Sequence, residues 1–454
     1  MTVSPVMQRL AAHIEQAPRE RLPAAVAEKT KHHVLDTIAA MVSGSRLLPG
    51  KKAIAFIRTR GGTKEASVVA SSIVTTAENA ALANGMLAHA DETDDSHAPS
   101  LTHPGCGIVP AALAMAEREA ASGEALLRAV ALGYDVGCRL TMALDAYQFR
   151  EDGHSTHSFG PMFGAAAAAA AIAHFDERQV RHCLSYTAQQ AAGISCWMRD
   201  EEHIEKAFDF GGMPARNGVA AALMVKHGFT GVEDVLSGER SFFVAYGRKP
   251  APERLVEGLG ERYEIMNTNI KRWSVGSPIQ APLDALDVLM REHRVKPGDV
   301  ERITVRVAHQ GANTTNDRAM PDICMQHLCA VMLLDGTVSF KAAHDDRRMR
   351  DARVLALRKK VQLLGDDDLT AAMPSRQGIV ELVLRDGTTL RHHIKAVRGT
   401  AENPMTRGEV DAKAHDLIAQ VYGRARARRL CDAIWNVDRL ANAAKLRTLL
   451  KEER

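Results

Sequence analysis

The sequence predicts a mainly α-helical protein, with a large all-helical domain and a smaller α+β domain that contains antiparallel strands. Apolar residues recur at three- and four-residue spacing through most of residues 5–235, as they do along one face of a helix. After about residue 270, short segments instead alternate apolar and polar residues, which is typical of half-buried strands. Aromatic residues make up only 4% of the chain, which together with abundant alanine favours closely packed helices.

Glycine and proline divide the helical part of the chain into separate segments. The clearest predicted helices are residues 29–43, 78–90, 108–121, 123–144, 178–195 and 215–228. Seven consecutive alanines, Ala165 to Ala171, belong to a further helix that carries almost no side-chain bulk. Because neighbouring helices can approach such a backbone closely, we expect this alanine helix at the centre of the helical domain.

The predicted strands lie in the later part of the chain. Residues 302–307 and 378–384 alternate in the strand period, and Asp386-Gly387 is a hairpin signal that leads into a return strand over 389–397. Predicted helices accompany these strands at residues 281–293, 325–334 and 350–360. The changes of period divide the chain into a helical domain (1–268), an α+β domain (269–407) and C-terminal helices (408–454) that pack back on the first domain.

Composition and charge exclude several classes of function. Apolar residues account for 46% and charged residues for 25%, as in an ordinary globular protein, and the formal net charge is only +3. The arginines near residues 424–429 are interpreted as a solvated helix face, so no nucleic-acid partner is expected. The N-terminus lacks the apolar core of a signal peptide and no run is apolar enough to span a membrane. Seven scattered cysteines indicate free thiols in a reducing compartment, so we expect a cytoplasmic protein.

Residues 89–103 form the most informative segment. They contain three histidines and four carboxylates beside serine and threonine, directly after a predicted apolar helix. So many groups that exchange protons near neutral pH indicate a site of proton transfer. The alternative interpretation is a polar helix end with incidental histidines. Metal binding is also open, but no spacing diagnostic of zinc is present and we predict no metal.

Reactive groups in suggestive settings occur at four further places. His154 precedes the alanine helix, where it is either a capping or a catalytic residue, and Lys206 precedes a glycine-rich turn at 209–213. Lys271 and Arg272 stand beside a tryptophan at the proposed domain boundary, where they either bind a carboxylate or form an ion pair between domains. His327 opens an apolar helix. The glycine-rich turn lacks the ending of a phosphate-binding loop, and no nucleophile elbow of a serine hydrolase follows a strand.

In their order along the chain, these motifs resemble the MmgE/PrpD family, which contains 2-methylcitrate dehydratase, cis-aconitate decarboxylase and iminodisuccinate epimerase. The resemblance covers nearly the whole chain and is carried by short motifs at residues 89–105, 153–160, 206, 215–218, 228–231, 271, 332–336, 399 and 404–406. It implies a large helical domain, a smaller α+β domain, a homodimer and a cleft between the domains. It also implies cofactor-free chemistry on small di- or tricarboxylates.

The resemblance carries the family's active-site pattern onto individual residues of this chain. His103, His154, Lys206 and Lys271 fall on matching positions, whereas Glu92 stands where aspartate is usual. Ser96 stands where threonine is common, and His327 stands where the decarboxylase branch has tyrosine. We therefore expect a pocket that is not tuned to cis-aconitate.

The expected catalytic residues are His103, His154, Glu92 and Lys206, and the expected substrate-binding residues are Asp95, Ser96, Lys271, Arg272 and His327. Which histidine is the base and which the acid is left open. The preferred reaction is dehydration of a hydroxy polycarboxylate, as in 2-methylcitrate dehydratase. Epimerisation and decarboxylation are the rival reactions, and an inactive family member that serves as a binding protein is the rival from another class.

Overall fold

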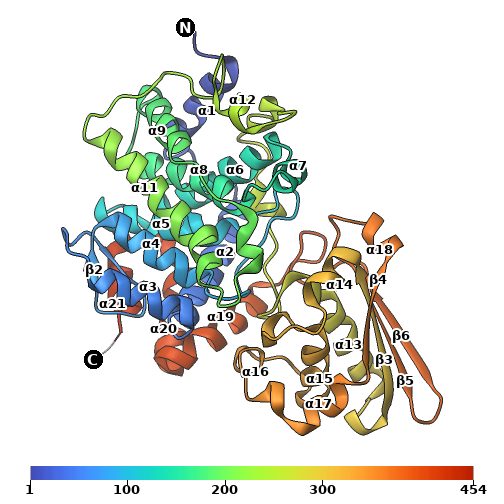
Figure 1. Ribbon diagram of the computed structural model, residues 1–454. Coiled ribbons are helices and arrows are strands. Elements are labelled where there is room, and N and C mark those ends of the chain that lie inside the picture. Colours follow the sequence, from blue (N-terminus) through green and yellow to red (C-terminus); the bar gives the residue numbers. More distant parts are fainter. Residues whose placement is uncertain (1, 453–454) are drawn as a thin grey trace. The chain divides into compact units, whose positions relative to one another are not determined.

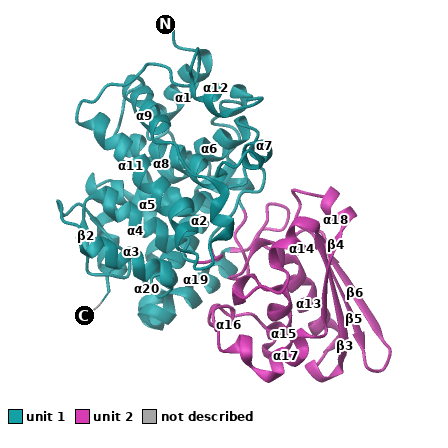
Figure 2. Cartoon of the chain, viewed as in Figure 1, with its two compact units in different colours: residues 1–90, 94–268, 407–454 teal, residues 91–93, 269–406 magenta. Residues whose placement is uncertain are grey.

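The computed structural model describes residues 2–452 and divides into two compact units (Figures 1 and 2). The first unit comprises residues 1–90, 94–268 and 407–454, and the second comprises residues 91–93 and 269–406. The chain therefore leaves the first unit for three residues within the segment that the sequence singles out. None of the described helices is long and apolar enough to cross a membrane.

The first unit is built almost entirely from helices, as predicted, with one two-stranded ribbon (Figure 1). Its helices are α1 Pro5–Gln16, α2 Ala24–Gly44, α3 Leu48–Arg58, α4 Ala77–Ala88, α5 Pro104–Arg118, α6 Gly123–Ala143, α7 Ala146–Glu151, α8 Thr156–Ile172, α9 Glu177–Gln189, α10 Ile204–Ala207, α11 Met213–Lys226, α12 Phe242–Tyr246, α19 Arg407–Tyr422, α20 Arg424–Trp435 and α21 Arg447–Leu450. The ribbon pairs β1 Ala66–Ser67 with β2 Val74–Thr75.

The alanine helix α8 lies in the core of this unit, where α5, α6 and α11 pack against it. Two glycines on α6, Gly133 and Gly137, face two on α8, Gly160 and Gly164, with the same four-residue spacing in both helices. A Cβ atom on Gly137 would lie 2.7 Å from the carbonyl oxygen of Gly160, and one on Gly160 would lie 2.8 Å from that of Gly137. The two backbones are therefore in direct contact, which only glycine permits.

The glycine-rich stretch at residues 208–212 differs from the predicted turn. It continues the helical path from α10 into α11 as a single π-helical turn, Phe208–Gly212. Gly211 in this turn packs directly on the backbone of Gly85 in α4. The glycines therefore serve a close helix–helix approach, and not a change of chain direction. The predicted helix over 178–195 also ends early, at Gln189, and Gly193 at φ 125° lies in the loop that follows.

The second unit contains a four-stranded sheet of order β4-β3-β5-β6 (Figure 1). Its strands are β3 Val300–Ala308, β4 Val361–Asp366, β5 Gly378–Leu384 and β6 Thr389–Ile394. The predicted antiparallel pairs are present, because β5 pairs antiparallel with both β3 and β6. The edge strand β4, which the sequence did not reveal, pairs parallel with β3 and makes the sheet mixed. Most of β4 is half-buried, and its residues do not alternate between apolar and polar as residues 302–307 of β3 do.

Helices in the second unit pack on the sheet around one core. They are α13 Gln280–His293, α14 His309–Thr315, α15 Met325–Asp335, α16 Phe340–Ala343, α17 Ala352–Arg358 and α18 Asp367–Ala371. Ile303, Val305 and Val307 of β3 are buried in this core together with the apolar faces of α13 and α15. The connection from β3 to β4 runs through α14 to α17, because a parallel pair cannot be joined by a tight turn.

Candidate functional site

Two histidines of the first unit stand at the ends of two helices that frame residues 89–103. His89 is the C-terminal cap of α4, and His103 is the N-terminal cap of α5. Pro104 occupies the first helical position of α5, where its fixed φ and missing N–H are tolerated. The helix ends thus set the backbone positions of both imidazoles.

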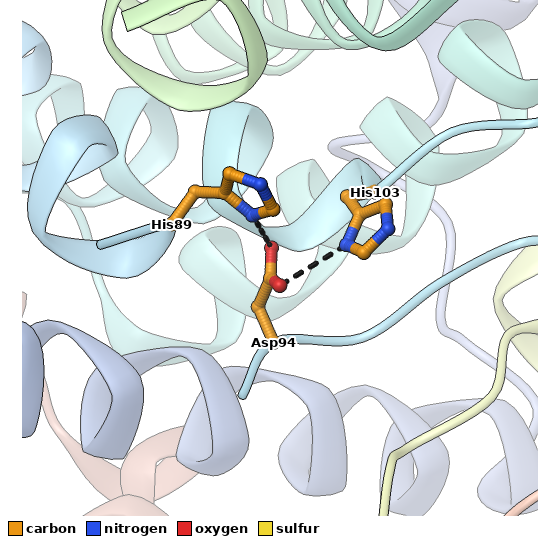
Figure 3. Close-up of side chains that lie close together, drawn as sticks. All are labelled: His89, Asp94 and His103. Carbon is orange, nitrogen blue, oxygen red and sulfur yellow. Dashed lines mark hydrogen bonds and ion pairs between the residues drawn. The ribbon is translucent and has the colours of Figure 1, made fainter. Parts of the chain in front are cut away.

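Asp94 joins the two imidazoles (Figure 3). Its Oδ2 atom lies 2.9 Å from Nδ1 of His89, and its Oδ1 atom lies 3.0 Å from Nδ1 of His103. All three side chains are buried. Burial by itself would raise the pKa of Asp94, but the charges and hydrogen bonds of the two imidazoles hold that pKa well below its usual range. A carboxylate that stays ionised between two histidines stabilises an imidazolium and fixes which ring nitrogen exchanges its proton.

Phe210 of the π-helical turn contacts several aromatic rings next to the trio of His89, Asp94 and His103. His89 stacks on Phe210 with ring centroids 4.3 Å apart, and His157 of α8 stacks on it at 3.8 Å. Trp197 meets the same phenyl ring edge-on at 4.7 Å. The ring of His157 lies 5.3 Å from that of His103, so the stack brings the first turn of α8 beside the Asp94 trio.

His157 carries no charge at neutral pH. Burial lowers its pKa well below the usual range, and the charges of His103, His89 and Lys206 act in the same direction. Its Nδ1 atom is buried and has no hydrogen-bond partner among residues 2–452. The ring is therefore neutral beside a pair of imidazoles that share a carboxylate.

Lys206 brings a positive charge to the same group of rings. Its ammonium nitrogen lies 5.2 Å from the ring centroid of Phe210 and 5.5 Å from that of Trp197, within the range of a cation–π contact. The side chain is half-buried, and its backbone N–H donates to Asp200 at 2.9 Å. This charge can stabilise an anion that forms next to the histidines.

Ligand atoms of His89, Asp94 and His103 all lie within 4.8 Å of one another, so the question of a shared metal ion arises. Two ligands around a tetrahedral zinc ion at ~2.1 Å would be separated by about 3.4 Å. The observed nitrogen–oxygen separations of 2.9 and 3.0 Å are instead those of direct hydrogen bonds. The geometry favours a hydrogen-bonded acid–base group, so the absence of a metal stays our prediction.

Comparison with known families decides the relationship of the chain. The model of the MmgE/PrpD N-terminal domain matches residues 8–255, and that of the MmgE/PrpD C-terminal domain matches residues 273–439. The chain belongs to the MmgE/PrpD family. The resemblance seen in the sequence motifs is thereby confirmed.

Similar proteins of the MmgE/PrpD family match over nearly their whole lengths. The cis-aconitate decarboxylase-like protein oryM of Aspergillus oryzae is 24% identical over 465 residues, which cover 95% of this chain and 94% of that protein. A cis-aconitate decarboxylase of Aspergillus terreus is 23% identical over 471 residues, which cover 94% of this chain and 92% of that protein. Both are similar to this chain at low identity.

The structure brings together some of the MmgE/PrpD residues that the sequence predicted in the first unit. His103 and Lys206 both meet Phe210. The ring of His154 instead stacks on Phe149 at 4.5 Å and also meets Phe159 and Tyr246, whereas the rings in contact with His103 are those of His89, His157 and Phe210.

Two further predicted residues of the first unit lie close to the trio in the chain. Ser96 is half-buried. Asp95 is fully buried, and its oxygens contact His33, Tyr134 and the backbone N–H of Gly105, while its predicted contact with substrate stays a prediction.

In the second unit, the predicted cations meet carboxylates of the chain itself. The ammonium of Lys271 donates to the backbone carbonyl of Glu92 at 2.7 Å and lies 3.4 Å from its carboxylate. Arg272 binds Asp284 at 3.0 Å and Asp287 at 2.9 Å. Carboxylates of the same unit therefore compensate both charges, and the predicted contact of these cations with a substrate carboxylate stays a prediction.

His327 of α15 is fully buried in the second unit. Burial lowers its pKa to about 4, and the charges of Arg358 and Arg348 add to the effect. Neither ring nitrogen has a hydrogen-bond partner among the described residues. The imidazole is neutral at physiological pH, and its predicted contact with substrate stays a prediction.

Sequence reasoning did not assign a role to His89, Asp94, His157 or Phe210. His89 and Asp94 lie in the segment that the sequence singled out. Assigning a role to every histidine and carboxylate of that segment would have included them. His157 follows His154 by three residues, but only His157 belongs to α8, which begins at Thr156. Phe210 carries no local signal, because the histidine rings that it contacts lie 53 to 121 residues away in the chain.

The third histidine of the segment, His97, makes a buried ion pair beside the site. Its Nε2 atom lies 3.3 Å from Glu264. Burial by itself would lower the pKa of His97, but Cys138 and Glu264 raise it to about 10. Burial by itself would likewise raise the pKa of Glu264. The hydrogen bond and charge of His97 are the largest of the effects that instead lower this pKa to about 2.

These shifts predict a loss of stability at alkaline pH. Because the pKa of His97 is raised from 6.5 to about 10 on folding, its contribution is complete below pH 6.5 and disappears as the pH rises through 10. Urea unfolding between pH 6 and pH 10 should therefore show a falling midpoint, and the fall should be smaller in His97→Gln. An equal fall in both proteins would contradict this assignment.

Proposed function

We propose that this chain is a lyase that acts on a small polycarboxylate by proton transfer at the carbon next to a carboxylate. The observation that carries the proposal is the pair of imidazoles on the buried carboxylate of Asp94, with a neutral imidazole, His157, beside them. A proton on such a carbon is weakly acidic. Its removal needs a base, an acid for the leaving group and a positive charge near the developing anion.

The side chains support distinct roles in this chemistry. Asp94 holds Nδ1 of His103, so Nε2 on the opposite side of that ring is the atom that exchanges a proton with substrate. His157 is neutral and accepts a proton, and Lys206 stabilises the negative charge that develops. We therefore pair His103 with His157 where the sequence paired it with His154.

Dehydration is the first reaction that we propose for this site. A base removes the proton from carbon, the neighbouring hydroxyl leaves with a proton from the acid, and water and a C=C bond are the products. Decarboxylation is the second candidate, because the two relatives named above carry the name of cis-aconitate decarboxylase or of a protein like it. In that reaction a carboxylate leaves as CO₂, and the carbanion left behind takes a proton from the acid.

The remaining features that the sequence predicted belong to the proposal as well. Glu92 stays a predicted catalytic residue, and Ser96, Lys271, Arg272 and His327 stay predicted substrate-binding residues. We also propose a cytoplasmic homodimer that needs neither metal nor cofactor. Full turnover after exhaustive chelation, with activity that does not depend on added metal, is the outcome expected of such an enzyme.

A panel of acids tests the proposed function. The purified chain is incubated with 2-methylcitrate, citrate, malate and cis-aconitate in heavy water. Ultraviolet absorbance from a new conjugated double bond indicates dehydration, and released CO₂ indicates decarboxylation. Deuterium uptake at carbon without either signal indicates epimerisation. A chain that gives none of these signals across the panel contradicts the proposal and favours a binding protein.

Two matched variants decide which histidine of α8 takes part. His157→Phe keeps an aromatic ring on Phe210 but removes the ring nitrogens, and we expect turnover to fall by about 10²–10⁴-fold. His154→Phe keeps the stack on Phe149 in the same way, and we expect turnover within a few-fold of wild type. The reverse result would return the acid–base pair to His103 and His154. Thermal unfolding of both variants is the control for folding.

A further inference from the structure

The fully buried carboxylate of Asp95 takes partners from three helices of the first unit. The hydroxyl of Tyr134 in α6 donates to Oδ2 at 2.6 Å, and Nδ1 of His33 in α2 lies 2.6 Å from the same oxygen. The backbone N–H of Gly105 in α5 donates to Oδ1 at 3.0 Å. No carboxylate oxygen is thus without a partner from the chain itself.

Asp94 and Asp95 are neighbours in the chain, but their carboxylates bind different groups. Asp94 binds the imidazole of His103, whereas Asp95 binds the N–H two residues after His103. As the cap residue of α5, His103 makes no side-chain bond to the helix backbone. Asp95 takes over that function, since a carboxylate at a helix N-terminus satisfies a free N–H and meets the positive end of the helix dipole.

We propose that Asp95 is a positioning residue for His103, held in place by Tyr134 and His33. Through Gly105 it fixes the first turn of α5, and with it the angle at which the imidazole of His103 meets Asp94. The proposal rests on the proposed function in one respect, namely that His103 exchanges a proton with substrate.

The charge states around Asp95 agree with this role. Burial lowers the pKa of His33 to about 4, although its hydrogen bond to Asp95 acts in the opposite direction. His33 is therefore a neutral donor at physiological pH and not a rival cation. Burial also raises the pKa of Tyr134 well above its usual range, and Asp95 adds to that effect. The phenol therefore stays protonated and donates a hydrogen bond to Asp95.

Kinetics of Asp95→Asn and Tyr134→Phe distinguish positioning from substrate binding. A positioning role predicts that kcat falls by about 10²-fold in Asp95→Asn and by a smaller factor in Tyr134→Phe, with KM within about twofold of wild type. The loss in the double variant should be close to that of Asp95→Asn alone, because both changes act through one carboxylate. A rise in KM at unchanged kcat would overturn the proposal in favour of substrate binding.

Tyr186→Phe is the matched control, since it removes a hydroxyl that donates to the backbone carbonyl of Thr230 at 3.0 Å on the surface. It should leave kcat and KM unchanged. If Asp95→Asn does not fold, Tyr134→Phe decides alone, because it removes one donor and leaves the carboxylate in place. Unchanged kcat in Tyr134→Phe would then overturn the proposal.

A second readout does not depend on turnover. Mass spectrometry measures the deuterium exchange of the C2 hydrogen of each histidine as a function of pH. We expect the exchange midpoint of His103 to move to lower pH in Asp95→Asn, because a misplaced imidazole loses contact with Asp94, while that of the exposed His309 stays the same. An unmoved midpoint at His103 would overturn the proposal, whereas inactivity of wild type on every acid would count against the proposed function alone.

Discussion

Replacement of His103 by asparagine should reduce kcat by about 10²–10⁴-fold with little change in the folded structure. The amide nitrogen of asparagine occupies nearly the position of Nδ1 in histidine, so the hydrogen bond to Asp94 at 3.0 Å can be kept. The atom that is lost is Nε2, which exchanges the proton in our proposal. The measurement is steady-state turnover of the acid that the wild-type chain converts.

Two controls accompany this prediction. Thermal unfolding should differ little from wild type, since Asp94 keeps both of its partners. His103→Gln places its amide nitrogen near Nε2 but loses the bond to Asp94, so it should be equally inactive and less stable. Turnover of His103→Asn within tenfold of wild type would remove His103 from the acid–base chemistry.

Valine at Gly137 should lower the free energy of unfolding by about 3 kcal/mol, near the upper end of the usual cost of overpacking. The reason is the contact between α6 and α8, where a Cβ on Gly137 would lie 2.7 Å from the carbonyl oxygen of Gly160. The obstacle is backbone of the central helix and not a flexible side chain, so the cost cannot be relieved locally. Urea unfolding followed by circular dichroism measures the change.

A graded series tests the cause. Gly137→Ala should cost less than Gly137→Val, because alanine is smaller and gains about 1 kcal/mol of helix propensity over glycine. Gly408→Ala is the matched control, since Gly408 lies in the first turn of α19 with nothing within 4 Å of an added Cβ. It should stay within about 0.5 kcal/mol of wild type. Wild-type stability in Gly137→Val would contradict the close crossing.

Most of the helices could be predicted because their periodicity is a local property. Residues 123–144 were expected as a helix and form α6 over Gly123–Ala143, since apolar residues recur along the whole of that segment. Strand β4 was missed because an edge strand that is half-buried needs no strict alternation. The turn expected at 209–213 is helical, because its glycines meet Gly85 of another helix and the sequence carries no sign of that partner.

The candidate site could be predicted only to the level of its segment. The density of histidines and carboxylates over residues 89–103 marked it, and the structure joins three of them as His89, Asp94 and His103. Asp94 and Asp95 look alike in the sequence. Their roles separate in space, because Asp94 contacts the two imidazoles, whereas Asp95 contacts α2, α6 and the start of α5.

The sequence by itself determined the fold class, the family and the segment that carries the proton-exchanging groups. These follow from periodicity and from motifs, which are properties of neighbouring residues. Tertiary structure alone decided that His157 and not His154 stands beside His103, that Phe210 holds the rings together and that Asp95 faces the start of α5. Those relations join groups from different helices, so they depend on how closely the helices pack, above all at the glycines of α6 and α8.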